Sequence, residues 1–151
     1  MSREQYEGLV GALCGAIDLP DTQAVLERGW IEVEGFEVLL LHNEADASAM
    51  YLNFHYGIVT PGRTLTVFRL LLEANLTVYA QDQAQLGINP ETSGIILIVR
   101  VPMSDDIDGA WFAETLAHYA EHGRYWSDNI LASTDEAFSG ICSGDYFWLK
   151  V

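Results

Sequence analysis

Apolar side chains recur every three or four positions at the start of this sequence, which is the spacing of one helical face. These residues are Tyr6, Leu9, Val10, Leu13, Cys14 and Ile17. The pattern predicts an amphipathic helix that ends at Asp18-Leu19-Pro20-Asp21, because proline and aspartate favour turns. Residues 22–28 are expected to add a further helical turn.

The pattern then changes to the alternation that is typical of strands. Strands are predicted over residues 30–34 and 36–42, joined by a tight turn at Glu34-Gly35, and over residues 49–56. One face of these strands is apolar and is expected to face the core. Its members are Ile31, Val33, Phe36, Val38, Leu40, Met50, Leu52 and Phe54. The opposite face mixes large apolar groups with acids, which is typical of a protein-binding surface.

A second helix is predicted from Thr60-Pro61, with Thr60 as the N-cap and Pro61 at the first helical position, to about Asn75. It is apolar almost all round, so it must bury two faces, one against the sheet and one against a second partner. Residues 76–83 are expected to form a loop. A hairpin follows, in which residues 89–94 reverse the chain between two apolar strands.

Pro102 is expected to close the last strand, and Ser104 or Asp105 to cap a third helix over about residues 106–127. The predicted order of elements is α-βββ-α-ββ-α. This order indicates an α+β fold in which helices pack against a twisted antiparallel sheet. Residues 1–128 are predicted to form one domain, and residues 129–151 a C-terminal tail that ends in an aromatic cluster.

Composition narrows the range of functions. Asp and Glu total 22 against 7 Lys and Arg, a formal net charge of −15. Such a charge opposes nucleic acids and anionic membranes and favours basic or unfolded polypeptides. No run approaches the roughly 18 apolar residues of a membrane span, so no membrane insertion is expected. Cys14 and Cys142 stand far apart and imply no disulfide framework, which fits a reducing cytosol.

One motif suggests the chemistry of an enzyme. Residues 118–122 match the H-x-x-E-H pattern, in which two imidazoles one helical turn apart bind zinc and the glutamate acts as general base. A third ligand would have to come from the short segment downstream, and a pattern with three fixed positions arises easily by chance. We therefore expect no catalytic residue, no metal and no cofactor, with both histidines on a solvated helix face and dispensable for the fold. A zinc-dependent hydrolase that uses His118, Glu121 and His122 stays the alternative.

Two segments of the sequence are specific, namely Leu72-Glu73-Ala74-Asn75 and Leu86-Gly87-Ile88-Asn89-Pro90-Glu91-Thr92. Both resemble the corresponding segments of the CesT-type, class I chaperones of type III secretion. With the order of elements, the resemblance extends over most of residues 4–126. It implies a small acidic homodimer of the bacterial cytoplasm that binds the N-terminal segment of a secreted virulence effector in extended form, without cofactor or ATP. A chaperone-like adaptor outside secretion is a further alternative.

Two surfaces are expected in such a protein. The outward face of the first three strands is predicted to take apolar side chains of the effector, while acids on and near this face steer its basic residues. The predicted effector-binding residues are Trp30, Leu39, Leu41 and Tyr51, and the acids are Glu32, Glu34 and Glu37. The second apolar face of the second helix is predicted to form the dimer interface, which the resemblance extends to the hairpin strands. Its predicted members are Leu65, Phe68, Leu71, Leu72, Leu86, Ile88, Ile96 and Ile98.

Overall fold

The structure is a computed structural model, and it describes residues 3–43, 45–82, 84–131 and 136. The chain divides into two compact units that alternate along the sequence. Unit 1 comprises Met1–Phe54 with Val99–Ala120, and unit 2 comprises His55–Ile98 with Glu121–Val151. Most of the predicted C-terminal tail lies outside the described residues, so the division into a domain of residues 1–128 and a tail stays a prediction.

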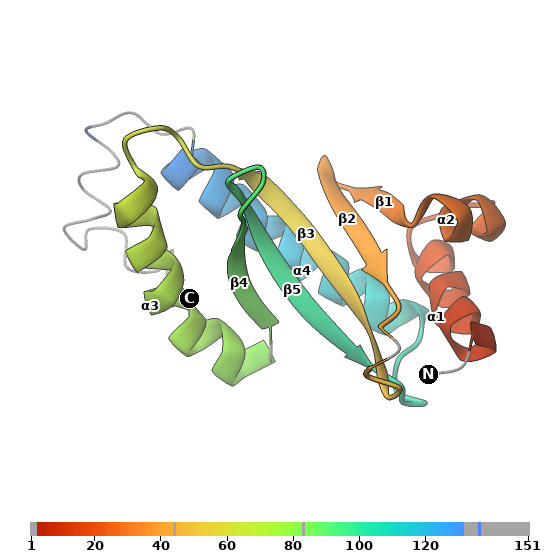
Figure 1. Ribbon diagram of the computed structural model, residues 1–151. Coiled ribbons are helices and arrows are strands. Elements are labelled where there is room, and N and C mark those ends of the chain that lie inside the picture. The colour runs from red at the N-terminus through yellow and green to blue at the C-terminus, as the bar shows by residue number, and fades with distance from the viewer. Residues whose placement is uncertain (1–2, 44, 83, 132–135, 137–151) are drawn as a thin grey trace. The chain divides into compact units, whose positions relative to one another are not determined.

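The described residues form four α-helices, a π-helical segment and five strands. The helices are α1 (Arg3–Ala16), α2 (Thr22–Arg28), α3 (Thr64–Asp82) and α4 (Gly109–Trp126), and the π-helical segment is Ser127–Leu131. The strands are β1 (Trp30–Val33), β2 (Phe36–Leu41), β3 (Ala49–Ile58), β4 (Ala84–Asn89) and β5 (Gly94–Pro102). The sheet has the order β1-β2-β3-β5-β4, so β1 and β4 are its edges (Figure 1). The α+β class, the antiparallel sheet and the end of the last strand at Pro102 are confirmed.

In unit 1, β1 and β2 form a hairpin with the predicted turn. Both turn residues have positive φ, 49° at Glu34 and 90° at Gly35, as a type I′ turn requires. Glycine adopts this conformation without strain, and the antiparallel ladder holds Glu34 in it. The register pairs Trp30 with Leu39 and Glu32 with Glu37 across the two strands.

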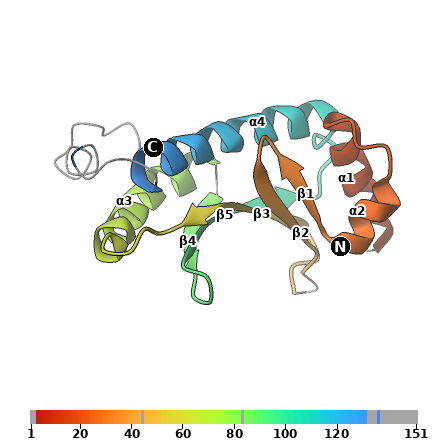
Figure 2. The same cartoon turned by 90° about the horizontal axis from the view of Figure 1, so that it is seen from above.

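The core of unit 1 follows the predicted alternation of the strands. All the residues expected to face the core are buried except Phe36, which is half-buried at the hairpin end. Tyr6, Val10, Leu13 and Cys14 bury the apolar face of α1, and burial raises the pKa of the Cys14 thiol. The expected helical turn at residues 22–28 is α2, which Asp21 caps at its start and Gly29 ends in the left-handed conformation. It packs against α1 and β1 (Figure 2).

In unit 2, the predicted start of α3 was wrong. The helix begins at Thr64 rather than at Thr60-Pro61. The Arg63 amide donates to the Thr60 carbonyl at 3.1 Å, and Gly62 has a φ of 89°. Proline at the second position and a positive-φ glycine at the third position make this segment a type II turn. Thr60 therefore begins a turn rather than capping the helix.

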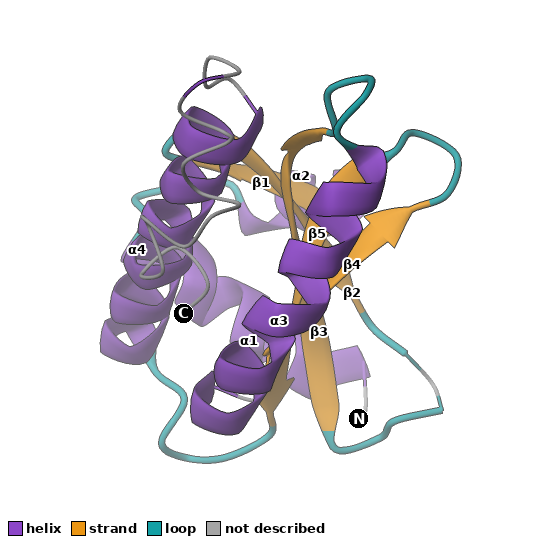
Figure 3. Ribbon diagram, turned by 90° about the vertical axis from the view of Figure 1, so that its left-hand side faces the viewer, coloured by secondary structure: helices purple, strands orange, loops and turns teal. Residues whose placement is uncertain are grey.

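The predicted end of α3 was also wrong, because residues 76–82 continue the helix instead of forming a loop. This segment contains no glycine or proline to interrupt the helix. It also extends the buried face of the helix by one turn. That buried face consists of Val67, Leu70, Leu71, Ala74 and Val78. It packs along β4, as Figure 3 shows.

The helix α4 begins one turn later than predicted. Its N-cap is Asp108, whose carboxylate accepts the Trp111 amide at 2.9 Å, rather than Ser104 or Asp105. Within unit 2, the π-helical segment that follows α4 is tied to the turn before α3. Arg63 Nη1 donates to the Ile130 carbonyl at 2.7 Å, and the Thr60 hydroxyl donates to the Leu131 carbonyl at 2.8 Å. No helix of the described residues is both long enough and apolar enough to cross a bilayer.

Candidate functional site

The outward face of the sheet in unit 1 exposes apolar side chains among acids. Trp30 and Leu41 are 38% and 41% exposed, and Leu39 and Tyr51 are half-buried. Trp30 and Leu39 are cross-strand partners, so β1 and β2 place two of the predicted effector-binding residues side by side. The residues of the opposite face are buried except for Phe36, and the alternation of the strands therefore assigns these side chains to the outside.

Two carboxylates lie directly opposite each other on the same face. Glu32 and Glu37 are register partners, both are exposed, and neither has a cation partner in the described part of the chain. Like charges directly opposite each other destabilise an antiparallel pair. A positively charged group supplied by another molecule would relieve this repulsion.

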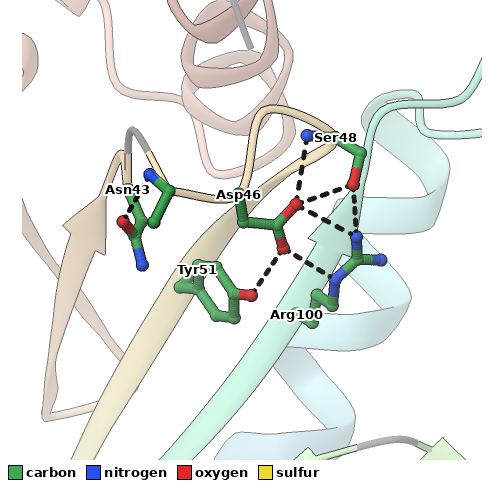
Figure 4. A network of polar contacts seen from close by, with 6 residues as sticks. Asn43, Asp46, Ser48, Tyr51 and Arg100 are labelled. Carbon is green, nitrogen blue, oxygen red and sulfur yellow. Dashed lines mark hydrogen bonds and ion pairs between the residues drawn. The ribbon is translucent and has the colours of Figure 1, made fainter.

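Tyr51 is held on this face by a network around Asp46 (Figure 4). The Tyr51 hydroxyl donates to Asp46 Oδ2 at 2.6 Å, and Arg100 Nε donates to the same oxygen at 3.1 Å. The other carboxylate oxygen accepts from the Ser48 amide at 3.1 Å and from the Ser48 hydroxyl at 2.7 Å. The network joins the β2–β3 loop to β3 and β5.

The same network shifts the acidity of its members. The hydrogen bond from Tyr51, followed by those from Ser48 and Arg100, holds the pKa of the Asp46 carboxyl well below its usual range. In turn, the hydrogen bond to Asp46 raises the pKa of Tyr51. Because the Tyr51 hydroxyl proton is donated to Asp46 within the protein, the residue can offer a partner its ring but not a hydrogen-bond donor.

The outer edge of β1 carries backbone groups that do not pair within the sheet. The Leu40 amide bonds to the Gly29 carbonyl, and hydrogen-bonded pairs alternate along an antiparallel ladder. Ile31 and Val33 therefore pair with β2, while the amides and carbonyls of Trp30 and Glu32 point away from it. Of these four groups, only the Trp30 carbonyl has a partner in the described residues, the guanidinium of Arg28.

Unit 2 exposes a different kind of apolar surface, a stripe along α3 opposite its buried face. Its members are Leu65, Phe68, Leu72 and Leu76, which are 83%, 40%, 71% and 80% exposed. They recur at intervals of three and four residues, which is the spacing of a helix–helix contact seam. The stripe confirms the prediction that α3 is apolar on two faces. Leu76 was missed because its segment was predicted to be a loop.

A groove of about 280 Å³ lies between the stripe and β4. It is lined by Phe68, Leu71, Leu72, Asn75, Leu86, Gly87 and Ile88. Five of the predicted dimer-interface residues therefore lie at one apolar groove, although Leu71 and Leu86 are themselves buried in the chain. Leu65 lies on the stripe, and Ile96 and Ile98 are half-buried on β5.

Asn75 closes the edge of β4 beside this groove. Its Nδ2 donates to the Leu86 carbonyl at 3.0 Å, and its Oδ1 accepts from the Leu86 amide at 2.7 Å. The side chain thus takes the place that a neighbouring strand would occupy. The two segments that carry the family resemblance meet in this contact, since Asn75 belongs to one and Leu86 to the other.

The geometry of the H-x-x-E-H segment does not favour zinc. His122 Nε2 accepts from Trp126 Nε1 at 3.2 Å, and because indole is only a donor, this nitrogen uses its lone pair there. His122 Nδ1 lies 3.1 Å from the Tyr56 hydroxyl. His122 is half-buried, so the expectation that both histidines are solvated was wrong for this one. No cluster of three potential ligands occurs among the described residues.

Sequence reasoning missed three residues that shape these surfaces, namely Arg28, Asp46 and Asn75. Asn75 was noted as part of a motif but not for its contact with β4. Asp46 and Asn75 each contact a residue that is distant in sequence, Arg100 at a separation of 54 residues and Leu86 at 11. Arg28 carries no local signal beyond its position in the last turn of α2.

Comparison with known proteins gives a likeness of fold. No family model matches the sequence, and no curated protein matches it. One chain of the ExsC–ExsE complex, known from its crystal structure, is similar with a TM-score of 0.64 and 21% identity, over 89% of this chain and 100% of that chain. The two chains share a fold. A chain of the heterodimeric ExoU–SpcU complex from the type III secretion system of Pseudomonas aeruginosa has a TM-score of 0.44 and 18% identity, over 61% and 76% of the chains, which is too low to carry an argument.

Proposed function

We propose that this protein is a class I chaperone of type III secretion that binds the N-terminal segment of an effector and keeps it soluble and competent for secretion. The observation that carries the proposal is the outward sheet face of unit 1, where exposed apolar side chains stand beside Glu32 and Glu37, two carboxylates with no cation partner among the described residues. The fold shared with a chain of the ExsC–ExsE complex supports it, as does the resemblance of the two sequence segments to CesT-type chaperones.

Recognition on this face combines apolar contact with charge. Trp30, Leu39, Leu41 and Tyr51 take apolar side chains of the effector. The Asp46 network fixes Tyr51 in advance, so less conformational freedom is lost on binding. The opposed pair Glu32 and Glu37 attracts basic effector residues, which speeds association more than it strengthens the complex.

The effector segment binds in extended form and adds to the edge of β1. The amide of Trp30 and the amide and carbonyl of Glu32 point outward there without partners in the described residues. A strand added to a sheet edge gains its affinity from such groups and its specificity from alternate side chains. The other edge is less suitable, because the side chain of Asn75 already hydrogen-bonds to the backbone amide and carbonyl of Leu86 on β4.

The chaperone acts as a homodimer through the α3 stripe and the adjoining groove of unit 2. An exposed stripe of four large apolar residues on one helix is typical of an obligate interface. A second copy of the chain supplies a matching stripe by symmetry. Binding of this kind needs no metal, cofactor or ATP, and it takes place in the bacterial cytoplasm before the effector is secreted.

The test is co-purification of the protein from its native host, followed by mass spectrometry of the bound proteins. We expect a secreted protein, whose purified N-terminal fragment binds the wild-type protein directly and binds the Leu39→Asp variant much more weakly. A direct partner that is not secreted would favour an adaptor outside secretion. Stoichiometric zinc that survives dialysis and is lost in His122→Ala would favour the hydrolase.

A further inference from the structure

Arg28 makes two contacts with the residue that begins the outer edge of β1. Its Nε donates to the Trp30 carbonyl at 2.7 Å, and its guanidinium carbon lies 4.9 Å from the centre of the Trp30 ring. One arginine therefore covers both the outward carbonyl and the exposed ring of Trp30. These are the two features of Trp30 that an added strand would use.

The geometry points to Arg28 as a displaceable guard of the β1 edge, which the effector segment must move aside before it can pair with Trp30. This inference rests on the proposed function and adds a regulatory step to it. An uncovered sheet edge also invites pairing with other chains, and proteins commonly protect such edges with charged side chains. The guard would keep the docking edge closed to unspecific strands in the absence of an effector.

A comparison of the two sheet edges shows why only one of them can open. At the β4 edge, two hydrogen bonds to the backbone of Leu86 come from Asn75, a half-buried side chain in the middle of α3. On β1, Arg28 makes one hydrogen bond and one ring contact from an exposed side chain at the end of α2. Water can replace the contacts of Arg28, whereas it has poorer access to those of Asn75.

The guard has a measurable consequence for binding. When the competent state is only a fraction of the population, the apparent dissociation constant rises by the inverse of that fraction. The surface hydrogen bond and the exposed cation–π contact of Arg28 are together strong enough to keep the edge of β1 covered in most molecules. Removing the guanidinium should therefore increase affinity about fivefold, through faster association and with little change in dissociation.

The test uses a defined extended probe, an end-capped eight-residue peptide in which valine and lysine alternate, labelled for fluorescence anisotropy and stopped-flow measurements. We expect Arg28→Ala to bind it about fivefold more tightly than the wild type. Arg28→Lys keeps the charge but loses the planar fork, so it should show a smaller increase. Arg124→Ala removes an equal charge from the exposed side of α4 and should stay within about twofold of the wild type.

Two controls separate the guard from other effects. The same peptide with alternate N-methylated residues keeps its side chains but loses backbone donors, so it should bind none of the variants well. In the free wild type, the Nε–H resonance of Arg28 should show a hydrogen-bonded proton by NMR, and this signature should disappear when the unmodified peptide is added.

The possible results distinguish failure of the guard from failure of the proposed function. Affinity that is unchanged or weaker in Arg28→Ala, while Leu39→Asp still weakens binding, would overturn the guard and leave the proposed function in place. If Arg28→Ala and Arg124→Ala increased the affinity for the peptide equally, the change in net charge would explain the effect and the guard would be overturned. If no variant binds the peptide, both the guard and the β1 docking edge are wrong.

Discussion

Units 1 and 2 both expose large apolar side chains, but the polar groups around them differ. In unit 1 the apolar residues alternate with acids, and one exposed arginine covers the adjoining sheet edge. In unit 2 the apolar residues form an uninterrupted stripe, and a half-buried asparagine closes the adjoining edge. Acids that alternate with apolar groups suit a partner that binds and leaves, whereas an uninterrupted stripe suits a permanent partner. Exposed apolar area alone would not have distinguished the two surfaces.

Breaking the stripe of unit 2 should have the largest effect. Phe68→Asp places a charge in the contact that the proposed dimer would remove from water, so we expect the dimer dissociation constant to rise at least ~100-fold. Sedimentation velocity measures this directly. Thr66→Asp, which lies on the flank of the same helix, is the matched control and should leave the dimer intact. A wild-type protein that is monomeric at micromolar concentration would contradict the assignment of this surface.

Breaking the sheet face of unit 1 should affect the other partner. Leu39→Asp should weaken binding of the effector fragment by about 2–4 kcal/mol, because the charge must be desolvated between apolar groups, while the dimer stays folded. Glu37→Gln on the same strand should change affinity only a few-fold but reduce the salt dependence of association. Titration of the fragment at two salt concentrations measures both. Full affinity of Leu39→Asp in a folded dimer would move the binding site elsewhere.

Opening the closed edge of β4 should cost stability. Asn75→Ala leaves the amide and carbonyl of Leu86 without their partners, so the free energy of unfolding should fall by about 1–3 kcal/mol. Urea denaturation measures this loss. Gln85→Ala, an exposed position on the same strand, should stay within about 0.5 kcal/mol of the wild type. An equal effect of the two substitutions would show that Asn75 does not close the edge.

The two histidines of the H-x-x-E-H segment fall in different units and should behave differently. His118 is exposed, so His118→Ala should change the free energy of unfolding by less than about 0.5 kcal/mol. His122→Ala leaves the buried Trp126 indole without its acceptor and should cost about 1–2 kcal/mol. Thermal or urea unfolding distinguishes the two. Equal losses would show that the contacts of His122 add nothing to stability.

The Asp46 network of unit 1 predicts a specific response to acid. The folded pKa of Asp46 lies below its unfolded value, so its contribution to stability is complete above the ordinary aspartate pKa of about 3.9 and is lost as the pH falls through the folded pKa. The stability difference between the wild type and Asp46→Asn should therefore be constant above about pH 5 and shrink as the pH falls from there to about pH 2. Urea denaturation across this range measures it, with Asp106→Asn as an exposed control. A difference that does not change with pH would contradict the network.

The sequence determined those features whose cause is local. The alternation of residues 30–41 and 49–56 assigned the two faces of the strands, because successive side chains of a strand point to opposite sides. Gly35 identified the hairpin turn at Glu34-Gly35, since glycine adopts positive φ without strain. The two apolar faces of α3 were also visible in advance. The errors at its ends had local causes as well, namely an unrecognised Pro61-Gly62 turn and a helix that continued because nothing interrupted it.

Only the tertiary structure decided how the polar groups of each surface are used. Asp46 accepts a hydrogen bond from Arg100, which is 54 residues away in the sequence, and Asn75 donates one to the backbone of Leu86, which is 11 residues away. Such contacts leave no periodic signal, because any aspartate or asparagine of the chain is equally able to make them. Arg28 lies close in sequence to Trp30, yet its position over the edge of β1 exists only once β1 and β2 have paired. Hydrophobic spacing determines where a surface lies, whereas the polar contacts that open or close it depend on which distant backbone groups the fold brings within reach.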